Sequence, residues 1–424
     1  MIDIKFIVEN PGIIKEGAAK KHVKIQIDKL IDLYNERNEL LQKTEGLRAE
    51  QNKQSATVAT AKTEDEKKSL LEKLSKIKKE IKDLEPELEK LEKEIDSLAF
   101  EIPNPPLDSV PDGKSEADNE IVSTYGEKPK FDFTPKDHIQ LGKDLDIIDI
   151  ERGVRTSGAR FYYLKNEAVL LQFAIVQHVI HKLTSKGFMP VIPPVLVKEE
   201  AMFATGFFPA DRNEIYEVNP NDDKLFLVGT SEVPLTMLHY TEILENSSLP
   251  LKYCGYSSCF RREAGSYGKD TAGIIRVHQF DKIEMFIFCK PEDSEAQHEF
   301  IRETEEEIMH ELGFHYQVVN ICGGDLGAPA AKKYDIEAWI PTQEKYREVT
   351  SCSNCTDFQA RRSRIRYKAE NGKNEYVHTL NGTAVAIPRT LVTILENYQQ
   401  KDGSVLIPEI LQSYMGGRTK IEKK

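Results

Sequence analysis

The stretch with the densest set of reactive side chains runs from Cys259 to Phe286 and reads CFRREAGSYGKDTAGIIRVHQFDKIEMF. Its pattern predicts two strands, and side chains of a strand alternate between two faces. Arg261 and Glu263 then share one face of the first strand. The returning strand is predicted to place polar and aromatic groups on one face: Arg276, His278, Phe280, Lys282 and Glu284. Its other face is mostly apolar, with Ile275, Val277, Ile283 and Met285. The glycine-rich segment between the strands predicts a mobile loop over a ligand.

Two arginines, an aromatic ring and two glutamates on one face suit an anionic ligand with a flat ring, such as a nucleotide. The alternative is an ion-pair ladder across two exposed strands, in which these charges only pair with one another. Three further sequence features favour the ligand site.

These three features lie far apart along the chain. Thr230 and Glu232 stand two residues apart at the end of an apolar strand, LFLVGTSEVPL, where a hydroxyl and a carboxylate can hold an ammonium group. Glu348 and Ser351, in REVTSCSNCTDFQARR, could hold a divalent cation that bridges phosphates. Arg389 follows a proline at the start of a run with helical period, and helix N-termini attract phosphates. We therefore expect Arg389 at the end of a phosphate chain.

The cysteines and histidines near these motifs show no metal-ligand spacing. Cys352 and Cys355 form a CxxC pair, but the second pair of ligands that a structural zinc site needs is missing. We expect packing or turn roles for both cysteines. His278 and His378 are expected to pack or to hydrogen-bond.

Two regions of different character must position these residues. From Leu70 to Leu98 apolar residues recur in alternating steps of four and three, which predicts a heptad seam. A weaker version of the pattern spans residues 30–50, so an antiparallel helical hairpin is predicted with its turn within 52–68. Pro86 is expected to kink the second helix without breaking it. A proline-rich linker, FEIPNPPLDSVPDG, places the domain boundary near Pro103, and the remainder is predicted to form one α+β domain.

Charge and composition limit the kinds of binding partner and the cellular compartment that are expected. The chain has 424 residues and a formal net charge of −12, which argues against a protein that coats nucleic acid everywhere but allows a local basic patch. Residues 43–82 hold eleven Lys or Arg and seven Asp or Glu, whereas residues 83–101 hold two and eight, so the tip of the hairpin is basic. No secretory signal or membrane span is predicted. Six cysteines in so long a chain suit a reducing compartment, so a cytoplasmic protein is expected.

Together these motifs resemble the class II aminoacyl-tRNA synthetases, and among them the seryl-tRNA synthetase family. The resemblance covers essentially the whole chain, including FRREAGSYGKD, the TSE triplet and the segment NGTAVAIPRTLVTILENYQ. It implies an α+β fold in which an N-terminal antiparallel coiled-coil hairpin precedes a class II antiparallel β-sheet core flanked by helices. Residues 1–102 would form the tRNA-binding domain and residues 103–424 the catalytic domain. The stretch ending in VIPP is similar to the family's motif 1, with Pro194 as its proline, and implies a homodimer.

The resemblance also implies roles on the ATP side. Arg261 would bridge the amino-acid carboxylate and the α-phosphate, Glu263 would read the adenine edge, and Phe280 would stack on adenine. Arg261 and Arg389 would be catalytic, and Mg²⁺ bound with ATP would lie near Glu348 and Ser351. The implied ATP-binding set is Arg261, Arg262, Glu263, Arg276, Val277, Phe280, Glu348, Val349, Thr350, Ser351 and Arg389.

On the serine side, the resemblance implies that Thr230 and Glu232 receive the ammonium group and that Glu284 and Thr383 bind the hydroxyl. The implied serine-binding set is Thr230, Ser231, Glu232, Arg261, Glu284, Asn381 and Thr383. A site that hydrogen-bonds a substrate hydroxyl can reject the analogue without it by about 10⁴- to 10⁵-fold. Alanine and glycine are therefore expected to be refused.

The implied reaction joins serine to ATP as seryl-adenylate with release of pyrophosphate, then transfers serine to the terminal ribose 3′-OH of tRNA(Ser), with tRNA(Sec) as a further candidate. The implied tRNA contacts are the coiled-coil arm and the motif 2 loop, where Ala272 stands in place of the arginine of many relatives. Two other interpretations stay open at this point. One is a ligase of the same fold that loads an amino acid onto a carrier protein, and the other is a non-catalytic tRNA-binding scaffold.

Overall fold

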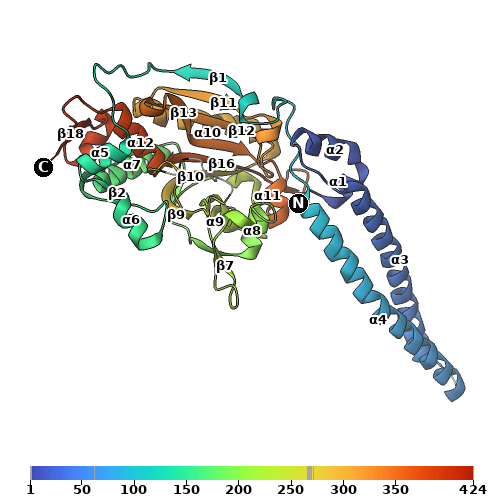
Figure 1. The fold of residues 1–424 in the computed structure, drawn as a ribbon. Coiled ribbons are helices and arrows are strands. Elements are labelled where there is room, and N and C mark those ends of the chain that lie inside the picture. Colours follow the sequence, from blue (N-terminus) through green and yellow to red (C-terminus); the bar gives the residue numbers. More distant parts are fainter. Residues whose placement is uncertain (1, 62, 265–269, 271, 424) are drawn as a thin grey trace. The chain divides into compact units, whose positions relative to one another are not determined.

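The computed structural model describes residues 2–61, 63–264, 270 and 272–423, which form two compact units (Figure 1). We call Ile2–Ala19 and Val23–Ile102 the arm unit. The core unit consists of Lys20–His22 and Pro103–Lys424. The chain thus contributes three residues to the core unit before it enters the long helices of the arm unit.

The arm unit is helical throughout most of its length. Its helices are α1 (Ile4–Glu9), α2 (Pro11–Lys20, the last residue counted with the core unit), α3 (Ile27–Val58) and α4 (Glu64–Glu101). α3 and α4 pair antiparallel, as the ion pairs Lys29–Glu94 (2.7 Å) and Lys43–Glu80 (3.1 Å) show. Apart from Ala99, the buried apolar residues of α4 fall on the predicted seam: Leu74, Ile77, Ile81, Leu91, Ile95 and Leu98. The heptad prediction is confirmed.

The turn of the hairpin is shorter than predicted. Residues 52–58 continue α3, and α4 begins at Glu64, so most of the predicted turn at 52–68 is helical. Small polar residues do not by themselves end a helix; Thr57 satisfies its hydroxyl by donating to the Lys53 carbonyl (3.0 Å). The Thr63 hydroxyl caps α4 by accepting from the Glu66 amide (3.3 Å), with three acidic residues in the first turn. α4 continues through the exposed Pro86.

The core unit is built on an eight-stranded sheet, antiparallel except where β4 pairs parallel with β9. In spatial order its strands are β1 (Glu120–Tyr125), β11 (Tyr316–Asn320), β12 (Lys332–Ile340), β13 (Lys345–Asn354), β16 (His378–Ala386), β10 (Gln279–Cys289), β9 (Leu251–Phe260) and β4 (Met189–Val191). The smaller sheets contain β2 (Ile148–Asp149) with β3 (Tyr163–Leu164); β5 (Leu196–Lys198), β7 (Leu225–Leu227) and β6 (Glu217–Val218); β15 (Asn374–Tyr376), β14 (Arg366–Lys368) and β8 (Ile243–Leu244); and β17 (Val405–Leu406) with β18 (Lys420–Ile421).

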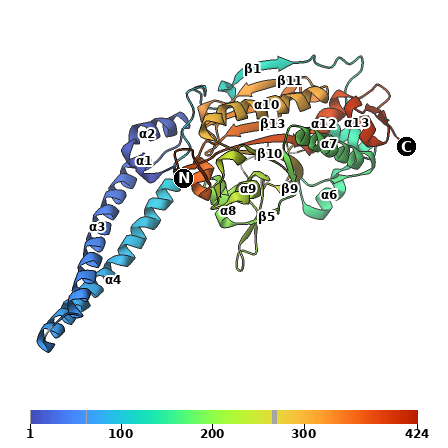
Figure 2. The same cartoon turned by 180° about the vertical axis from the view of Figure 1, so that it is seen from behind.

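Helices pack against this sheet, among them α10 and α12 (Figure 2). The helices of the core unit are α5 (His138–Asp144), α6 (Ile150–Ser157), α7 (Asn166–Ser185), α8 (Glu199–Thr205), α9 (Glu232–Thr236), α10 (Ser294–Glu311), α11 (Phe358–Ser363), α12 (Ile387–Asn397) and α13 (Glu409–Gln412). In the described ranges, no helix has the length and apolar character needed to cross a membrane.

Strand β10 separates the core from the site. From Ile283 onward its odd-numbered residues, such as Met285, are fully buried in the main hydrophobic core, which also takes in Ile301 of α10. Lys282 and Glu284 alternate with them and point to the other face, where a pocket lies. The period-two alternation thus holds along β10, as the sequence predicts.

The predicted strands are too long at the ends that meet the loop. β9 ends at Phe260 and β10 begins at Gln279, so neither 261–263 nor 275–278 lies in a strand. One backbone bond, from the Arg261 amide to the His278 carbonyl (3.0 Å), continues the pairing. Beyond it the Arg262 amide donates to Glu214 (2.8 Å), and Glu263 adopts a left-handed backbone with φ of +52°. Ile275 and Val277 are buried in the main hydrophobic core, as predicted, and they also line the pocket.

Candidate active site

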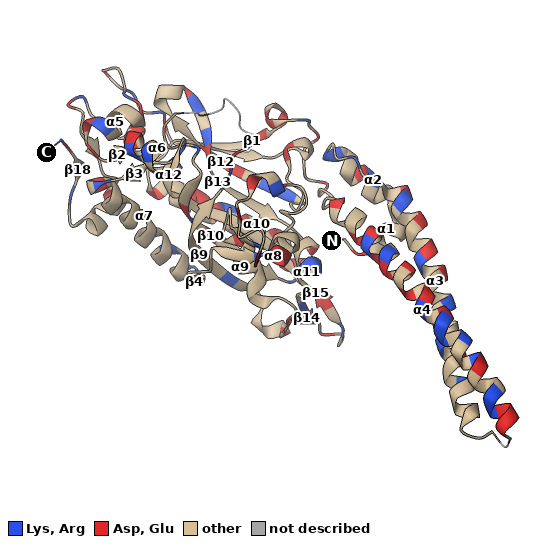
Figure 3. Cartoon of the chain, turned by 60° about the horizontal axis from the view of Figure 1, so that its bottom comes forward, with Lys and Arg blue, Asp and Glu red and all other residues tan. Residues whose placement is uncertain are grey.

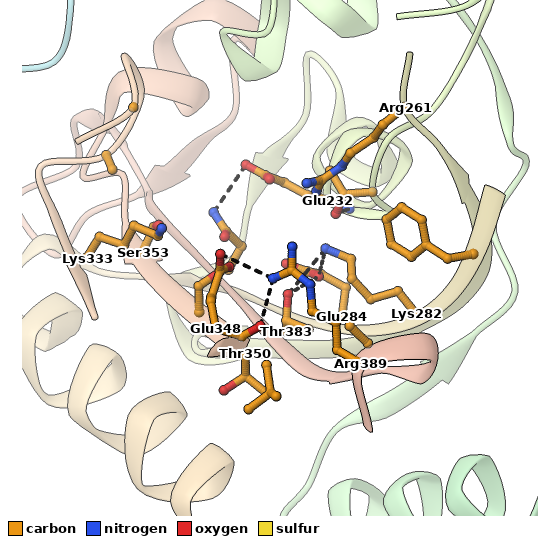
Figure 4. A pocket seen from close by; sticks show the side chains of 18 of the residues that line it. Glu232, Arg261, Lys282, Glu284, Lys333, Glu348, Thr350, Ser353, Thr383 and Arg389 are labelled. Atoms are coloured by element: carbon orange, nitrogen blue, oxygen red, sulfur yellow. Dashed lines mark hydrogen bonds and ion pairs between the residues drawn. The ribbon is translucent and has the colours of Figure 1, made fainter. Parts of the chain in front are cut away.

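A cavity of about 410 Å³ opens beside β10, β13 and β16. Figure 4 shows how charged side chains from separate elements point into it. Five cations and five carboxylates line it: Arg261, Arg276, Lys282, Lys333 and Arg389, with Asp211, Glu232, Glu263, Glu284 and Glu348. Nearly all the residues singled out from the sequence meet here, although they span 160 positions of the chain from Thr230 to Arg389.

At one end of the cavity lies Glu232, the first residue of α9. Its carboxylate accepts hydrogen bonds from the side-chain amides of Gln359 (2.7 Å) and Asn381 (3.1 Å), and its backbone amide donates to the Thr230 hydroxyl (3.2 Å). Burial, reinforced by the Glu284 carboxylate, raises the pKa of Glu232 to about 7. A buried carboxylate with so high a pKa is suited to receive a cationic group from a ligand.

Next to it, β10 and β16 present a mixed hydroxyl and charge cluster. Glu284 is paired with Thr383 across the two strands, next to a register shift between Ile283 and Glu284. The Thr383 hydroxyl donates to the Glu284 carboxylate (3.2 Å), and the Lys282 ammonium donates to Thr383 (3.3 Å) and forms an ion pair with Glu284. Both Lys282 and Glu284 are buried. Such a cluster can exchange hydrogen bonds with a small hydroxyl group.

Arg261 stands just past the end of β9. Its guanidinium donates to the Gly229 carbonyl (3.3 Å) and lies 5.5 Å from the centre of the Phe280 ring. Among the described residues Arg261 has no ion-pair partner, whereas the pocket's other two arginines are each paired with a carboxylate. An arginine that has not been neutralised by the protein is available to an anionic ligand.

The loop-side wall of the pocket holds a second arginine. Arg276 forms an ion pair with Glu263 (2.6 Å), and its Nε lies 3.7 Å from the Asp270 carboxylate. Phe280 supplies an aromatic face beside this pair. A planar ring and a carboxylate that can accept from an amino group suit a nucleotide base.

Arg389 occupies the first turn of α12, after Pro388. Its guanidinium donates to the Glu348 carbonyl (2.8 Å) and lies 3.2 Å from the Glu348 carboxylate (Figure 4). Burial pushes the pKa of Glu348 upward, but Arg389, Lys333 and Arg261 outweigh it and hold the pKa at about 2. Glu348 is therefore ionised under all ordinary conditions.

Glu348 and Ser351 lie three positions apart on β13, where a regular strand would place them on opposite faces. The pairing of β12 with β13 shifts between Ile336 and Glu337, so that one extra residue, Val349, is inserted on β13. Glu348 and Ser351 therefore both line the pocket, together with Val349 and Thr350.

An ionised carboxylate beside a hydroxyl fits a Mg²⁺ ion that arrives with a triphosphate, because Mg²⁺ takes one or two protein oxygens and fills its shell with phosphate and water. Among the described residues no cluster of three or more His, Cys, Asp or Glu side chains could hold a metal by itself. The donor set thus suits a cation shared with a ligand.

Two residues predicted for the site lie outside the pocket lining. Arg262 is exposed, because the backbone turns away from the ladder at this residue. Ser231 is buried, and its hydroxyl donates to the Gly255 carbonyl (3.1 Å), so it holds the TSE triplet against β9. The His278 Nδ1 donates to the Arg261 carbonyl (2.8 Å), an ordinary hydrogen-bonding role.

Several pocket residues carry no strong sequence signal. Lys333 is half-buried; desolvation lowers its pKa, but Asp335 and Glu348 outweigh this and raise the pKa above its ordinary value. The segment Gly327–Ala330 lines the pocket mainly through backbone and small side chains, and Cys355, a buried thiol, lines it from beyond β13. The alternation of KKYDIE could have indicated Lys333, whereas no sequence pattern indicates Gly327–Ala330.

The motif 2 loop, predicted to contact tRNA, lies largely outside the described residues, which omit 265–269 and 271. Ala272, just after it, is described and exposed.

Comparison with known proteins gives two family matches that together span most of the chain. Residues 1–106 match the seryl-tRNA synthetase N-terminal domain, and residues 214–398 match the tRNA synthetase class II core domain (G, H, P, S and T). A "Serine--tRNA ligase" of Treponema denticola is 46% identical over 419 residues, which cover 98% of this chain and 99% of that protein.

Solved structures match over the full length as well. The seryl-tRNA synthetase of Pyrococcus horikoshii, complexed with ATP, superposes with a TM-score of 0.92 at 42% identity and covers 100% of both chains. The cytoplasmic serine-tRNA ligase of Naegleria fowleri, in complex with AMP, gives a TM-score of 0.88 at 35% identity and covers 100% of this chain and 99% of its own.

Proposed function

The chain belongs to the seryl-tRNA synthetase family, and on that premise we propose that its pocket activates serine with ATP for ligation to tRNA. The observation that carries this proposal is the polarity of the cavity. One end offers a carboxylate and a hydroxyl cluster, which suit a zwitterion with a hydroxyl group, and the rest offers arginines and an aromatic ring, which suit ATP.

At the serine end, Glu232 and Thr230 receive the ammonium group. Glu284 and Thr383 exchange hydrogen bonds with the serine hydroxyl, and Asn381 fixes the orientation of Glu232 (3.1 Å). Alanine and glycine leave this buried polar cluster unpaired, which makes them poor substrates. Ser231 contributes from outside the pocket by anchoring the triplet that carries both ammonium partners.

At the nucleotide end, adenine stacks on Phe280, and Glu263 accepts from its exocyclic amino group while Arg276 holds Glu263 in place (2.6 Å). Val277, Val349 and Thr350 form walls of this part of the pocket. Arg389 holds the far end of the triphosphate from the first turn of α12. Glu348 and Ser351 would hold a Mg²⁺ ion that arrives with ATP, which would supply positive charge beside the phosphates.

Arg261 lies where the two substrates meet, and it bridges the serine carboxylate and the α-phosphate. A carboxylate oxygen of serine attacks the α-phosphorus, the bond to the bridging oxygen breaks, and pyrophosphate leaves. The 3′-OH of tRNA then attacks the acyl carbon, and AMP leaves. No protein nucleophile takes part; the chain supplies alignment and fixed positive charge where negative charge develops.

The arm unit serves as the tRNA-binding domain, which the sequence places at residues 1–102. The Lys and Arg residues within 43–82 contact the phosphates of tRNA(Ser); Figure 3 shows the basic residues of the hairpin in blue. tRNA(Sec) is a further candidate substrate. The motif 2 loop contacts the acceptor end. The enzyme works as a homodimer in the cytoplasm.

ATP–pyrophosphate exchange with serine, threonine, alanine, glycine and cysteine tests the activation half of this proposal without tRNA. We expect exchange with serine alone. Exchange with another amino acid would overturn the hydroxyl cluster as a serine site, and the absence of exchange in folded protein with Mg²⁺ present would favour a non-catalytic scaffold. Stable seryl-tRNA formation then distinguishes a tRNA ligase from a carrier-protein ligase.

A further inference from the structure

The segment Gly327–Ala330, which we call the pocket wall, lines the cavity between η6 (Gly323–Asp325) and β12. It has no strand or helix to fix it, so its four carbonyl groups need other partners. Each of the four accepts a hydrogen bond from Lys21 or Asn104, and the Gly327 carbonyl also accepts from the Ala330 amide (3.3 Å).

Lys21 holds three of these carbonyls. Its ammonium donates to Gly327 (2.9 Å), Ala328 (3.2 Å) and Ala330 (2.6 Å), which matches the three donors of an ammonium group. The side chain is 4% exposed, and burial lowers its pKa to about 7. A lysine removed so far from water is held in place by these carbonyls, and they by it.

Asn104 completes the set. Its side-chain amide donates to the carbonyls of Pro329 (2.9 Å) and Cys355 (2.9 Å), and its backbone amide donates to Ala328 (2.9 Å). Asn104 is 5% exposed. It therefore joins the wall to a second lining residue, Cys355.

From Cys355 the contacts lead to the serine end of the pocket. The Asn381 side-chain amide lies 3.6 Å from the Cys355 thiol and donates to the Glu232 carboxylate (3.1 Å). A displacement of the wall or of Cys355 therefore changes the position of Asn381 and the hydrogen bonding of Glu232, which the proposed function makes the ammonium acceptor.

Lys21 and Asn104, which we call the clamp, lie at the two ends of the helical hairpin in the sequence. Lys21 lies six residues before the first residue of α3, and Asn104 lies three residues after the last residue of α4. Lys21 belongs to the three-residue segment that packs with the core unit, where Lys20 forms an ion pair with Asp112 (3.3 Å). The whole helical hairpin is thus inserted between two residues that grip the same four-residue wall.

We propose that Lys21 and Asn104 are positioning residues that couple the occupancy of the helical hairpin by tRNA to the geometry of the serine end of the pocket, through the Gly327–Ala330 wall. The inference rests on the proposed function, since it takes the hairpin as the tRNA-binding element. Both connections into the hairpin are short, so a change in the direction of α3 or α4 reaches the wall through Lys21 and Asn104. Binding of tRNA to the hairpin then favours one arrangement of the wall, and this changes the affinity of the pocket for the aminoacyl group.

The first measurement is serine-dependent exchange by the full-length variants Lys21→Met, Lys21→Arg and Asn104→Ala, without tRNA. Loss of these buried donors should raise the KM for serine about tenfold, with the KM for ATP little changed. Lys21→Arg, which keeps a donor-rich cation, should restore most of the serine affinity. Lys24→Met, which changes an exposed lysine of the same connection, is the matched control.

The second measurement is the dissociation constant of a non-hydrolysable seryl-adenylate analogue, with and without tRNA(Ser) that lacks the terminal 3′-OH. In the wild type and in Lys24→Met the two constants should differ about fivefold or more. In Lys21→Met and Asn104→Ala they should become equal, while the affinity for tRNA alone stays the same.

The outcomes separate the two proposals. The coupling would be overturned if the wild type bound the adenylate analogue equally well with and without tRNA. It would also be overturned if the ratio of these two dissociation constants were undiminished in both clamp variants. Serine-dependent exchange would still support the proposed function in either case. A purely structural role would lower the melting temperature of the variants without moving the serine KM or the ratio. Absence of serine-dependent exchange in the wild type would overturn the proposed function and this inference with it. If Lys21→Met does not fold, Asn104→Ala, which removes one side-chain amide, decides.

Discussion

Arg261 faces the pocket with a carbonyl and an aromatic ring as neighbours, and among the described residues it has no carboxylate partner. Its charge is therefore available to the transition state. Arg261→Ala should reduce serine-dependent exchange about 10³-fold, since a fixed donor aimed at developing charge contributes on this scale. Arg418→Ala, which changes an exposed arginine near the C-terminus, should leave exchange unchanged. Near-normal exchange by Arg261→Ala would remove Arg261 from the mechanism.

Glu232 should make serine binding depend on pH. Burial and then the Glu284 carboxylate raise its pKa to about 7, so the free enzyme loses the Glu232 negative charge as the pH falls through 7. The serine ammonium stays protonated in this range, so the KM for serine should rise about tenfold per unit below pH 7. Exchange kinetics between about pH 5.5 and 8.5 test this. The KM for ATP should not change with pH in this way. The variant Glu232→Gln should bind serine weakly at every pH.

Thr383 should carry selectivity for the hydroxyl. Its Oγ1 lies between the Lys282 ammonium (3.3 Å) and the Glu284 carboxylate (3.2 Å). Thr383→Val keeps the shape and removes the hydroxyl, so kcat/KM for serine in exchange should fall about 10²-fold, with little change for alanine. Thr419→Val, at an exposed position, is the matched control. Equal losses for serine and alanine would point to a general packing defect.

At the scale of elements, the hairpin α3–α4 has an excess of Lys and Arg over residues 43–82 and an excess of Asp and Glu over residues 83–101, although both colours occur along its length in Figure 3. The triple variant Lys53→Ala, Lys67→Ala, Lys68→Ala removes exposed tip lysines and should weaken tRNA binding. A plot of log affinity against log salt concentration has a negative slope. If each lysine contacts one phosphate, this slope should become less steep by about 2 to 3 in the triple variant. Lys90→Ala with Lys93→Ala, near the base, should leave the slope unchanged. Filter binding measures the salt dependence of tRNA binding for the tip variant and the base variant. The same change of slope in both would show that the tRNA does not bind at the tip.

The clamp of Lys21 and Asn104 also belongs to this scale, because it is a property of the connections and not of either helix. Heptads explain why α3 and α4 form, but they do not fix where the hairpin is anchored. That anchoring depends on two buried polar residues and the carbonyls of a segment that lies 309 positions from Lys21 and 225 from Asn104, counted to Ala330 and Pro329.

At the scale of the whole molecule, exposed apolar side chains gather on α7 and the segment that follows it: Leu170, Phe173, Met189 and Ile192. Ile192 is 84% exposed, which is unusual for an isoleucine of a monomer. If this surface is the homodimer interface, Phe173→Glu should give monomers in analytical ultracentrifugation, whereas Leu406→Glu on β17 should stay dimeric. Unchanged mass for Phe173→Glu would exclude this surface.

The sequence by itself determined the local order of the chain. Heptad steps fix which face of α4 is buried, alternation fixes the two faces of β10, and a proline fixes the start of α12, because each is a short-range preference of the backbone. These rules, with the motifs that carry the family resemblance, identified many residues of the pocket but missed Lys333 and Gly327–Ala330, and two predicted site residues, Arg262 and Ser231, lie outside its lining. They also made the hairpin turn too long at both ends, since polar residues are compatible with a solvated helix.

Tertiary structure alone decided how strands end and which distant groups share a charge environment. β9 and β10 separate at Phe260 and Gln279 because backbone amides beyond them find partners in other segments. One inserted residue on β13 places Glu348 and Ser351 on the same side, and no local propensity predicts that register. The pKa values of Glu232 and Glu348 move in opposite directions because burial and nearby charges are properties of the assembled pocket. The pocket wall is likewise invisible in the sequence, because it is held by the carbonyls that every residue has.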